Sequence, residues 1–329
     1  MTSPSPAVRP ASTPGPDADD SADARPDRLA RFRPWTRNVL LANVIGQILI
    51  IGTGGAVRLT DSGLGCSTWP MCEPGQFTPA FHAESTIHPY VEFGNRTMTG
   101  VLGVIGVMVL LLVWTDRRRS RAYRALGVVP LVGVAAQAVI GGVVVLLELH
   151  PGWVSLHFGV SAALVWFSAY LLHRHGEGDG PPARIGSRAV ATTGALLGLL
   201  LVPVVTLGVL VTGSGPHSGD TEVGYRLALD PLSVTRAHSA TVWLFVLTLG
   251  ALLVLLHRAR AAAGAPAGAL PRARRAAWLL LAVTLAQGAI GYVQYFTGLP
   301  ELLVGIHLVG AGSLTWATAN AVLRLRNRA

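Results

Sequence analysis

Eight apolar runs, each about 20 residues long, constrain this 329-residue chain more than any other feature of its sequence. A helix of that length crosses the ~30 Å hydrocarbon layer of a bilayer. Charged residues make up 13% of the chain, against roughly 25% in a soluble domain, so the runs are not the interior of a soluble protein. We predict an all-α integral membrane protein with spans at about 38–57, 93–114, 126–147, 153–173, 190–212, 235–256, 276–297 and 302–323.

The basic residues predict the orientation of these spans. All 26 of them are Arg, and all but four fall before the first run or in the segments 117–124, 174–188, 258–275 and 324–328, on one side of the membrane. The positive-inside rule makes this side cytoplasmic, with both termini inside, in a multi-pass protein of the plasma membrane. Because the arginines flank spans and form no basic patch on a soluble domain, the lipid bilayer is the expected partner and nucleic acid is not.

The segment before the first run is rich in Pro, Ala, Asp and Arg and shows no apolar period. We therefore predict that residues 1–34 form a disordered cytoplasmic tail. They do not form a signal peptide, because the apolar run that follows is too long and lacks a small-residue cleavage pattern.

The second half of the chain repeats the first. The segment AQAVIGGVVVLLELHPGWVSLHFGVSAALVW, starting at Ala136, aligns without a gap with AQGAIGYVQYFTGLPELLVGIHLVGAGSLTW, starting at Ala286. Each repeat holds an even number of spans, so both insert the same way up, related by a pseudo-two-fold axis along the membrane normal. We predict two tandem four-helix bundles at 35–175 and 190–329, joined by a cytoplasmic linker at 176–189. The alignment pairs Gln137 with Gln287, Gly141 with Gly291, His157 with His307, and Trp166 with Trp316.

Three of the ten histidines lie inside apolar runs: His157, His238 and His307. An ionisable side chain inside a membrane is costly and is a candidate functional group, although a single one often only hydrogen-bonds to a neighbouring helix. The repeat weakens that alternative, because it places two of the three at equivalent positions. At about 1.5 Å of rise per residue, all three lie at a similar depth near the outer ends of their spans.

In the second half, His238 and His307 form a facing pair, the arrangement that ligates a haem iron from both sides. Four arginines stand on the outer side against the charge bias. Contact with lipid phosphates would explain them, but an anionic partner explains them better, and two of them are placed to bind haem propionates. The two are Arg226 and Arg236, and the others are Arg58 and Arg96.

The first half breaks this pattern. The position equivalent to His238 falls in VEFGNR, where Asn95 stands, so His157 is a lone strong ligand. An iron with two histidines is saturated and suits electron transfer, whereas a five-coordinate iron suits chemistry on a bound substrate. Glu92, at helical spacing from Asn95 and Arg96, could act as a general base or stabilise a developing positive charge. The alternative is an interfacial carboxylate paired with Arg96 or Arg58.

The chain has two cysteines, Cys66 and Cys72, both in the outer loop GLGCSTWPMCEP. In an oxidising compartment this spacing favours a disulfide. A metal site is less favoured, because two thiolates have no nearby partners at the usual spacing. The spacing leaves open whether the disulfide is structural or redox-active. The second half has no counterpart, so we expect the pair to serve the first bundle.

Together these residues resemble the haem A synthase family. The resemblance runs from about residue 38 to the end of the chain. It rests on the eight spans, the duplicated bundle, the outer cysteine pair, the EFGNR segment and the three helical histidines. It implies an oxidoreductase that converts haem O to haem A for terminal oxidase biogenesis, oxidising a ring methyl to a formyl group by successive hydroxylations.

The resemblance also implies roles for single residues. The second bundle would hold haem b as cofactor between His238 and His307, and the first would receive haem O at His157. Glu92 resembles the family's catalytic carboxylate. The implied partners are a haem O synthase and an electron acceptor, and self-association into a homo-oligomer is left open. The other residues implied at the haem O site are Asn95, Arg58 and Arg96.

Two other classes of protein share part of this pattern. A membrane electron carrier, such as a quinol-reactive cytochrome with haem b, would share the histidine pair but needs a second saturated site, which Asn95 contradicts. A transporter is expected to have broken helices with polar residues near the midplane, whereas here the polar residues gather at the outer edge. We rank the synthase first, the cytochrome second and the transporter last.

Overall fold

The computed structural model describes residues 29–80, 86–217 and 225–328. Within this part of the chain, eight helical segments are long and apolar enough to span a membrane, with mean hydropathies from 1.4 to 2.5. The predicted all-helical membrane protein with eight spans is therefore confirmed. The long helices are α1 (Thr36–Leu59), α2 (His88–Trp114), α4 (Val129–Leu146), α5 (Pro151–His175), α6 (Arg188–Ser214), α7 (Pro231–Arg258), α8 (Ala269–Phe296) and α9 (Glu301–Leu323).

Most of the predicted tail, residues 1–28, lies outside the described residues. Its last residues are ordered, because a 3₁₀ helix, η1 (Ala30–Trp35), leads directly into α1. Arg33 in η1 donates hydrogen bonds to the carbonyl of Leu112 and, at 2.9 Å, to the hydroxyl of Thr115. The boundary predicted at residue 34 is therefore too late, because these contacts hold η1 against the end of α2.

The third span has a broken start that the apolar pattern did not predict. A short helix, α3 (Arg121–Leu126), is capped by Ser120, whose hydroxyl accepts a hydrogen bond from the backbone N–H of Tyr123. Helix α4 follows after two residues, with Pro130 in its first turn. Proline has no N–H to donate to the preceding turn, so α3 cannot run on into α4.

Several long helices extend beyond their apolar runs, because polar caps and prolines define where they start. Helix α7 begins at Pro231, and Asp230 caps it by accepting a hydrogen bond of 2.9 Å from the backbone N–H of Ser233. Helix α5 begins at Pro151 in the same way, after His150. Proline suits the first helical position because the N–H it lacks has no partner there.

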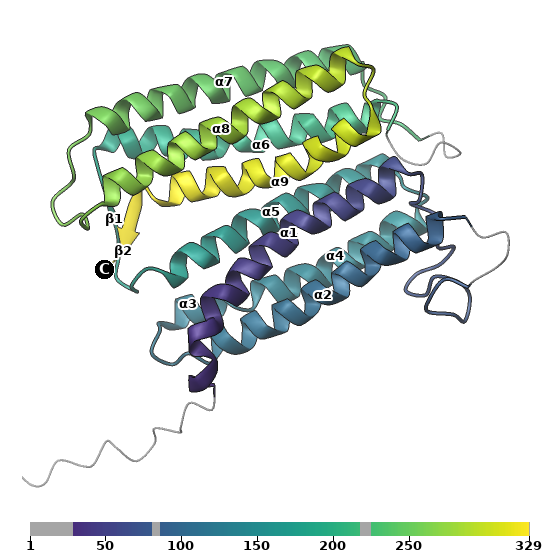
Figure 1. Ribbon diagram of the computed structural model, residues 1–329, viewed down its shortest axis with the longest axis horizontal. Coiled ribbons are helices and arrows are strands. Elements are labelled where there is room, and N and C mark those ends of the chain that lie inside the picture. Colours follow the sequence, from purple (N-terminus) through teal and green to yellow (C-terminus); the bar gives the residue numbers. More distant parts are fainter. Residues whose placement is uncertain (1–28, 81–85, 218–224, 329) are drawn as a thin grey trace, which may run out of the picture.

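The long helices form two groups of four (Figure 1). In the first bundle, α1 and α4 each pack on both α2 and α5. In the second bundle, α6 and α8 each pack on both α7 and α9. In each ring, α2 therefore lies diagonally across from α5, and α7 from α9. The bundles meet where α9 packs on α1 and α5, and where α5 packs on α6.

Small residues bring helices close together in the second bundle. Ala273 and Ala277 of α8, and Ala317 and Ala321 of α9, are fully buried. Lipid chains are as apolar as side chains, so close van der Waals packing of this kind is what holds membrane helices together.

The two ends of the bundles differ in character. One end, which we call the arginine-rich end, carries the segments 117–124, 174–188, 258–275 and 324–328. The other, the histidine end, carries the starts of α2, α5, α7 and α9. The linker predicted at 176–189 is ordered at the arginine-rich end, where its strand β1 (Pro182–Arg184) pairs antiparallel with β2 (Arg326–Arg328).

Asp179 fixes this linker to the first bundle. Its carboxylate accepts hydrogen bonds of 3.0 Å from Nε of Arg119 and 2.7 Å from the backbone N–H of Ser120. The hydrogen bond from Arg119 holds the pKa of Asp179 well below its usual range. The carboxylate therefore stays charged at neutral pH and neutralises the basic residues around it.

Candidate functional site

Two equivalent histidines lie against two equivalent glycines. His157 on α5 faces Gly141 on α4, where an added Cβ would lie 3.5 Å from Cε1 of the ring. His307 on α9 faces Gly291 on α8, where the same distance is 3.4 Å. Because glycine has no Cβ, each imidazole can approach the backbone of the neighbouring helix closely. The repeat therefore preserves a histidine–glycine contact and not only a histidine.

The third histidine has the same kind of neighbour. His238 on α7 faces Gly208 on α6, and a Cβ there would lie 3.2 Å from Cε1 of the ring. In the first bundle the equivalent residue, Asn95 on α2, has Gly54 of α1 as its neighbour, with 3.9 Å between its amide oxygen and an added Cβ. That oxygen accepts a hydrogen bond of 2.7 Å from the hydroxyl of Thr53.

The second bundle brings two imidazoles together. His238 and His307 project from diagonal helices of the ring and are close enough for their charges to interact. The structure thus places in one bundle the two residues that we predicted to form a pair. The first bundle has His157 on one diagonal helix and Asn95 on the other.

One ring nitrogen of each of these histidines is buried and unpaired within the described part of the chain. The Nδ1 atoms of His157, His238 and His307 are buried and have no hydrogen-bond partner of normal geometry among the described residues, although the Val204 backbone lies beside His238. Leaving a buried polar group unpaired costs about 1–3 kcal/mol. Imidazole nitrogen is the common protein ligand of haem iron, so these orphaned nitrogens and the cradles opposite them fit that group.

Two glutamines fix the helices at the level of the histidines. Gln137 on α4 donates hydrogen bonds of 3.0 Å to the carbonyl of His157 and 2.6 Å to the hydroxyl of Ser161. Its equivalent, Gln287 on α8, lies directly against Gly310 of α9, where any Cβ would overlap with the amide. Both glutamines therefore set the position of the histidine-bearing helix relative to its neighbour.

Glu92 lies at the start of α2 and is 4% exposed. One carboxylate oxygen accepts hydrogen bonds from Arg96, at 3.1 Å from Nε, and the other accepts a bond of 2.7 Å from the backbone N–H of Cys66. The pairing with Arg96 is the alternative that the sequence left open. Hydrogen bonds to both carboxylate oxygens hold the side chain of Glu92 in one position, so its charge is fixed in place.

Cys66 and Cys72 form the predicted disulfide, and both are fully buried. Their loop is fastened to α2, because Arg96 donates to the carbonyls of Thr68 at 3.0 Å and Met71 at 3.1 Å. The loop also reaches α4: the indole of Trp69 covers Gly142, next to the glycine that faces His157. The cysteine pair thus belongs to the first bundle, as we expected from the lack of a counterpart in the second.

Arg58 and Arg226 lie together where the two bundles meet. Arg58, near the end of α1, donates to the carbonyl of His217 and, at 3.2 Å, to that of Thr212. Arg226 donates to the carbonyl of Gly215 at 2.6 Å. The two charges are close enough to interact. Arg58, which we had grouped with Arg96, therefore contacts the second bundle.

Arg236 is exposed on the first turns of α7. Its charge acts on Asp230, the residue that caps α7. The hydrogen bond from Ser233 is the main reason that the pKa of Asp230 lies below its ordinary value, and Arg236 adds to it. This guanidinium is two residues before His238 and at the same end of the helix.

Sequence reasoning missed several residues of these sites. Gly208 and Thr53 had no motif to mark them. Gly141 and Gly291 were paired by the repeat, and that pairing was the available signal, but a glycine in an apolar helix has many structural uses. Trp69 lies in a loop whose path depends on the disulfide, which a linear pattern does not describe.

The fold and these sites define a polytopic helical membrane protein with histidine sites at one end of its bundles. The sequence model of the cytochrome oxidase assembly protein family (COX15-CtaA) matches residues 37–217. This is more than half of the chain, and the chain belongs to this family.

Curated relatives carry one common name. The chain is similar to the heme A synthase of Lysinibacillus sphaericus (strain C3-41), with 38% identity over 145 residues, or 43% of this chain and 44% of that protein. It is also similar to the heme A synthase of Bacillus cereus (strain AH187), with 32% identity over 145 residues and 44% of each chain covered. The matched region therefore spans less than half of the length of these relatives.

Proposed function

We propose that this protein is a haem A synthase, an oxidoreductase that converts a methyl group of haem O to the formyl group of haem A by successive hydroxylations. The observation that carries the proposal is the set of three histidine–glycine contacts, which supply a histidine pair in one bundle and a single histidine in the other. The relatives named heme A synthase support it. Its product would serve the assembly of a terminal oxidase, in keeping with the description of the family.

We assign haem b to the second bundle, with His238 and His307 as its iron ligands. When bound, this group supplies one-electron transfer, since an iron with two histidine ligands is saturated. The chain holds two imidazoles across the diagonal of the ring, with Gly208 and Gly291 making room for them. Arg226 and Arg236, at the same end of the bundle, are the residues we assign to the propionates.

We assign the substrate, haem O, to the first bundle, with His157 as its one strong ligand. On the diagonal helix, Asn95 offers an amide already bonded to Thr53, which leaves the far face of the substrate without a second histidine. Arg96, which is half-buried and follows Asn95 on α2, is the arginine that we assign to the binding of the substrate. Arg58 contacts the segment 212–217, so we assign it to the junction between the two bundles.

Glu92 is the catalytic carboxylate in this proposal. Hydrogen bonds from Arg96 and from the backbone N–H of Cys66 fix its position. A fixed carboxylate is suited to stabilising positive charge that develops on a nearby substrate, because it needs no reorganisation when that charge appears. Of the two roles that the sequence allowed, we therefore favour charge stabilisation over proton abstraction.

We propose further that the bundles are tandem copies related by a pseudo-two-fold axis along the membrane normal. The contacts between bundles support this, since α1 on α9 has its counterpart in α6 on α5, and α5 on α9 is its own counterpart. The arginine-rich end and both termini would face the cytoplasm of a plasma-membrane protein. A haem O synthase would supply the substrate and a separate acceptor would remove electrons, with a homo-oligomer left open.

Pigment analysis of the detergent-purified protein tests the proposal. The protein is expressed with and without a source of haem O, and its haems are extracted and identified by chromatography and mass. Haem b in both samples, with haem A or its hydroxylated precursor only when haem O is present, is the expected result. Haem b without modified haem in either sample would favour the electron carrier instead, and a protein without any haem would exclude both.

A further inference from the structure

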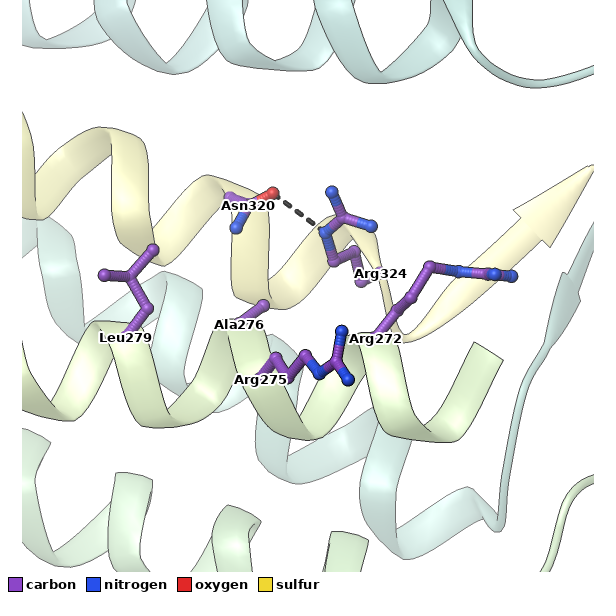
Figure 2. Close-up of a pocket in the computed structure, with 6 residues that line it drawn as sticks. All are labelled: Arg272, Arg275, Ala276, Leu279, Asn320 and Arg324. Atoms are coloured by element: carbon purple, nitrogen blue, oxygen red, sulfur yellow. Dashed lines mark hydrogen bonds between the residues drawn. The ribbon is translucent and has the colours of Figure 1, made fainter. Parts of the chain in front are cut away.

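A cavity of about 270 Å³ opens between the start of α8 and the end of α9, at the arginine-rich end of the second bundle (Figure 2). Its α8 wall is one face of the helix, with side chains three, four and seven residues apart. Its α9 wall consists of two side chains one turn apart. The lining residues are Arg272, Arg275, Ala276 and Leu279 of α8, Asn320 of α9, and Arg324, the C-cap of α9.

Positive charge is concentrated around this cavity without an acidic partner. Three guanidinium groups line it, and among the described residues no carboxylate forms an ion pair with any of them. Arg324 donates a hydrogen bond of 2.9 Å from Nε to the amide oxygen of Asn320 (Figure 2). Burial and the nearby charge of Arg272 lower the pKa of Arg324 below its ordinary value. This position therefore strongly favours an anion.

The start of α8 adds to the same potential. Its first turn contains no acidic residue, and its N-cap, Gly268, has no side chain that could cap the helix. The guanidinium of Arg272 folds back over this turn, 3.2 Å from where a Cβ of Gly268 would lie. A helix N-terminus carries partial positive charge, so arginine is the reverse of the residue that would stabilise it there.

The first bundle supplies an internal comparison. The alignment of Ala136 with Ala286 makes Arg174 the counterpart of Arg324. The charge of Arg174, however, is neutralised by acidic side chains. It bonds to Glu177 and Asp179, at 3.3 Å in both cases, and is 4% exposed. The counterpart of Glu177 in the second bundle is Asn327. The counterparts of Arg272 and Arg275 in the first bundle are Ala122 and Ala125.

The cavity changes from charged to apolar along α8. Ala276, which is buried, keeps its floor open because it has a short side chain. Leu279, one turn farther from the helix start, is 41% exposed. Arginine at one end of the cavity and an exposed leucine at the other match a ligand with an anionic head and an apolar tail.

We propose that this cavity binds the phosphate headgroup of an anionic phospholipid, with an acyl chain lying along Leu279 on the outer face of α8. The arginines and Asn320 provide the donors for the phosphate oxygens. A free phosphate ion would accept the same hydrogen bonds, but it has no apolar part to contact Leu279. The site is separate from the histidine end and does not depend on which reaction the protein catalyses.

Native mass spectrometry of the full-length protein in detergent tests this inference. Dioleoyl phosphatidylglycerol and dioleoyl phosphatidylcholine are titrated separately, and inorganic phosphate is added in a third series. The test variant is Arg272→Gln with Arg275→Gln, two residues that line the cavity. The control is Arg188→Gln with Arg260→Gln, which removes the same charge from exposed positions of the same end. We expect the test variant to weaken phosphatidylglycerol binding about 10- to 30-fold and the control to change it less than about twofold.

Three outcomes would overturn the proposal. Equal retention of the two lipids would show that no anionic headgroup is recognised. Equal weakening by the control pair would show general charge attraction rather than a site. Displacement of phosphatidylglycerol by an equal concentration of inorganic phosphate would identify a free anion as the ligand. If the double variant does not fold, Arg275→Gln alone carries the same test, with a smaller expected weakening of about fivefold.

Discussion

The two bundles use one helical framework for two different sites. The second bundle presents a pair of imidazoles, and its histidine end has no disulfide loop among the described residues. The first bundle keeps one imidazole, replaces the other with Asn95, and adds the cysteine loop, Glu92 and Arg96. The difference suggests how a duplicated bundle can come to hold two distinct sites. In the proposed function, the copy with two histidines would retain its haem, and the copy with one would leave a face of its haem open.

Substituting one histidine in each bundle should have the largest effect, because the two variants should lose different activities: haem b retention in one and haem A formation in the other. We expect His307→Ala to lower the haem b content more than about tenfold, since it removes one of the two proposed iron ligands. We expect His157→Ala to leave haem b in place and to abolish haem A formation. Pyridine haemochrome analysis of the purified variants measures the first, and mass analysis of extracted haems measures the second.

Gln137→Leu serves as the control for His157→Ala. It removes the two hydrogen bonds that position α5 but leaves the imidazole, so a smaller loss of product is expected. Loss of haem b from His157→Ala would contradict the assignment of the two haems to separate bundles.

Glu92→Gln should sharpen the comparison within the first bundle. The amide keeps the size and part of the hydrogen bonding of the carboxylate but not its charge. We expect the product to fall by about 100-fold with no change in haem b, as when an electrostatic group is removed from an active site. Glu301→Gln, an exposed residue in the first turn of α9, should change neither quantity. Wild-type product yield from Glu92→Gln would exclude charge stabilisation by this residue.

The number of spans and the residue types of the sites could be predicted from the sequence. The eight apolar runs mark the spans because the bilayer fixes their length. The three histidines stood out because ionisable residues inside apolar helices are costly. The gapless repeat then predicted that His157 and His307 occupy equivalent places, and the glycines opposite them agree with that prediction.

The contacts that cross between distant segments could not be predicted in this way. Arg58 was grouped with Arg96 because both lie on the outer side of the first half, yet it binds carbonyls of the second. Its partners are backbone atoms, which leave no signal in the residue types. The same holds for β1 and β2, three residues each, because their pairing depends on where α5 and α9 end.

Restoring the missing ligand should make the first bundle resemble the second. In Asn95→His, an imidazole would stand opposite His157, with Gly54 leaving room on α1. We expect the haem of the first bundle to become six-coordinate and low-spin, and the yield of haem A to fall about tenfold because the open face is closed. Absorption and electron paramagnetic resonance spectra report the spin state. Thr53→Val, which only frees the amide of Asn95, should leave the spin state unchanged. An unchanged spectrum in folded Asn95→His would show that position 95 does not face the haem.

The smallest effects should come from the glycines, where the two bundles differ by tenths of an ångström. A Cβ at Gly208 would lie 3.2 Å from the ring of His238, closer than carbon atoms normally approach, whereas one at Gly141 would lie 3.5 Å from the ring of His157, an ordinary contact. We therefore expect Gly208→Ala to displace its imidazole and weaken haem b retention about fivefold. Gly141→Ala should change haem O retention less than about twofold.

Gly250→Ala, on the same helix as His238 and with nothing within 4 Å of the new Cβ, is the matched control. Haem release to an excess of apomyoglobin measures retention in each variant. If Gly208→Ala and Gly250→Ala retained haem b equally well, the glycine would not be the cradle of this ring, and the contact would reflect helix packing alone.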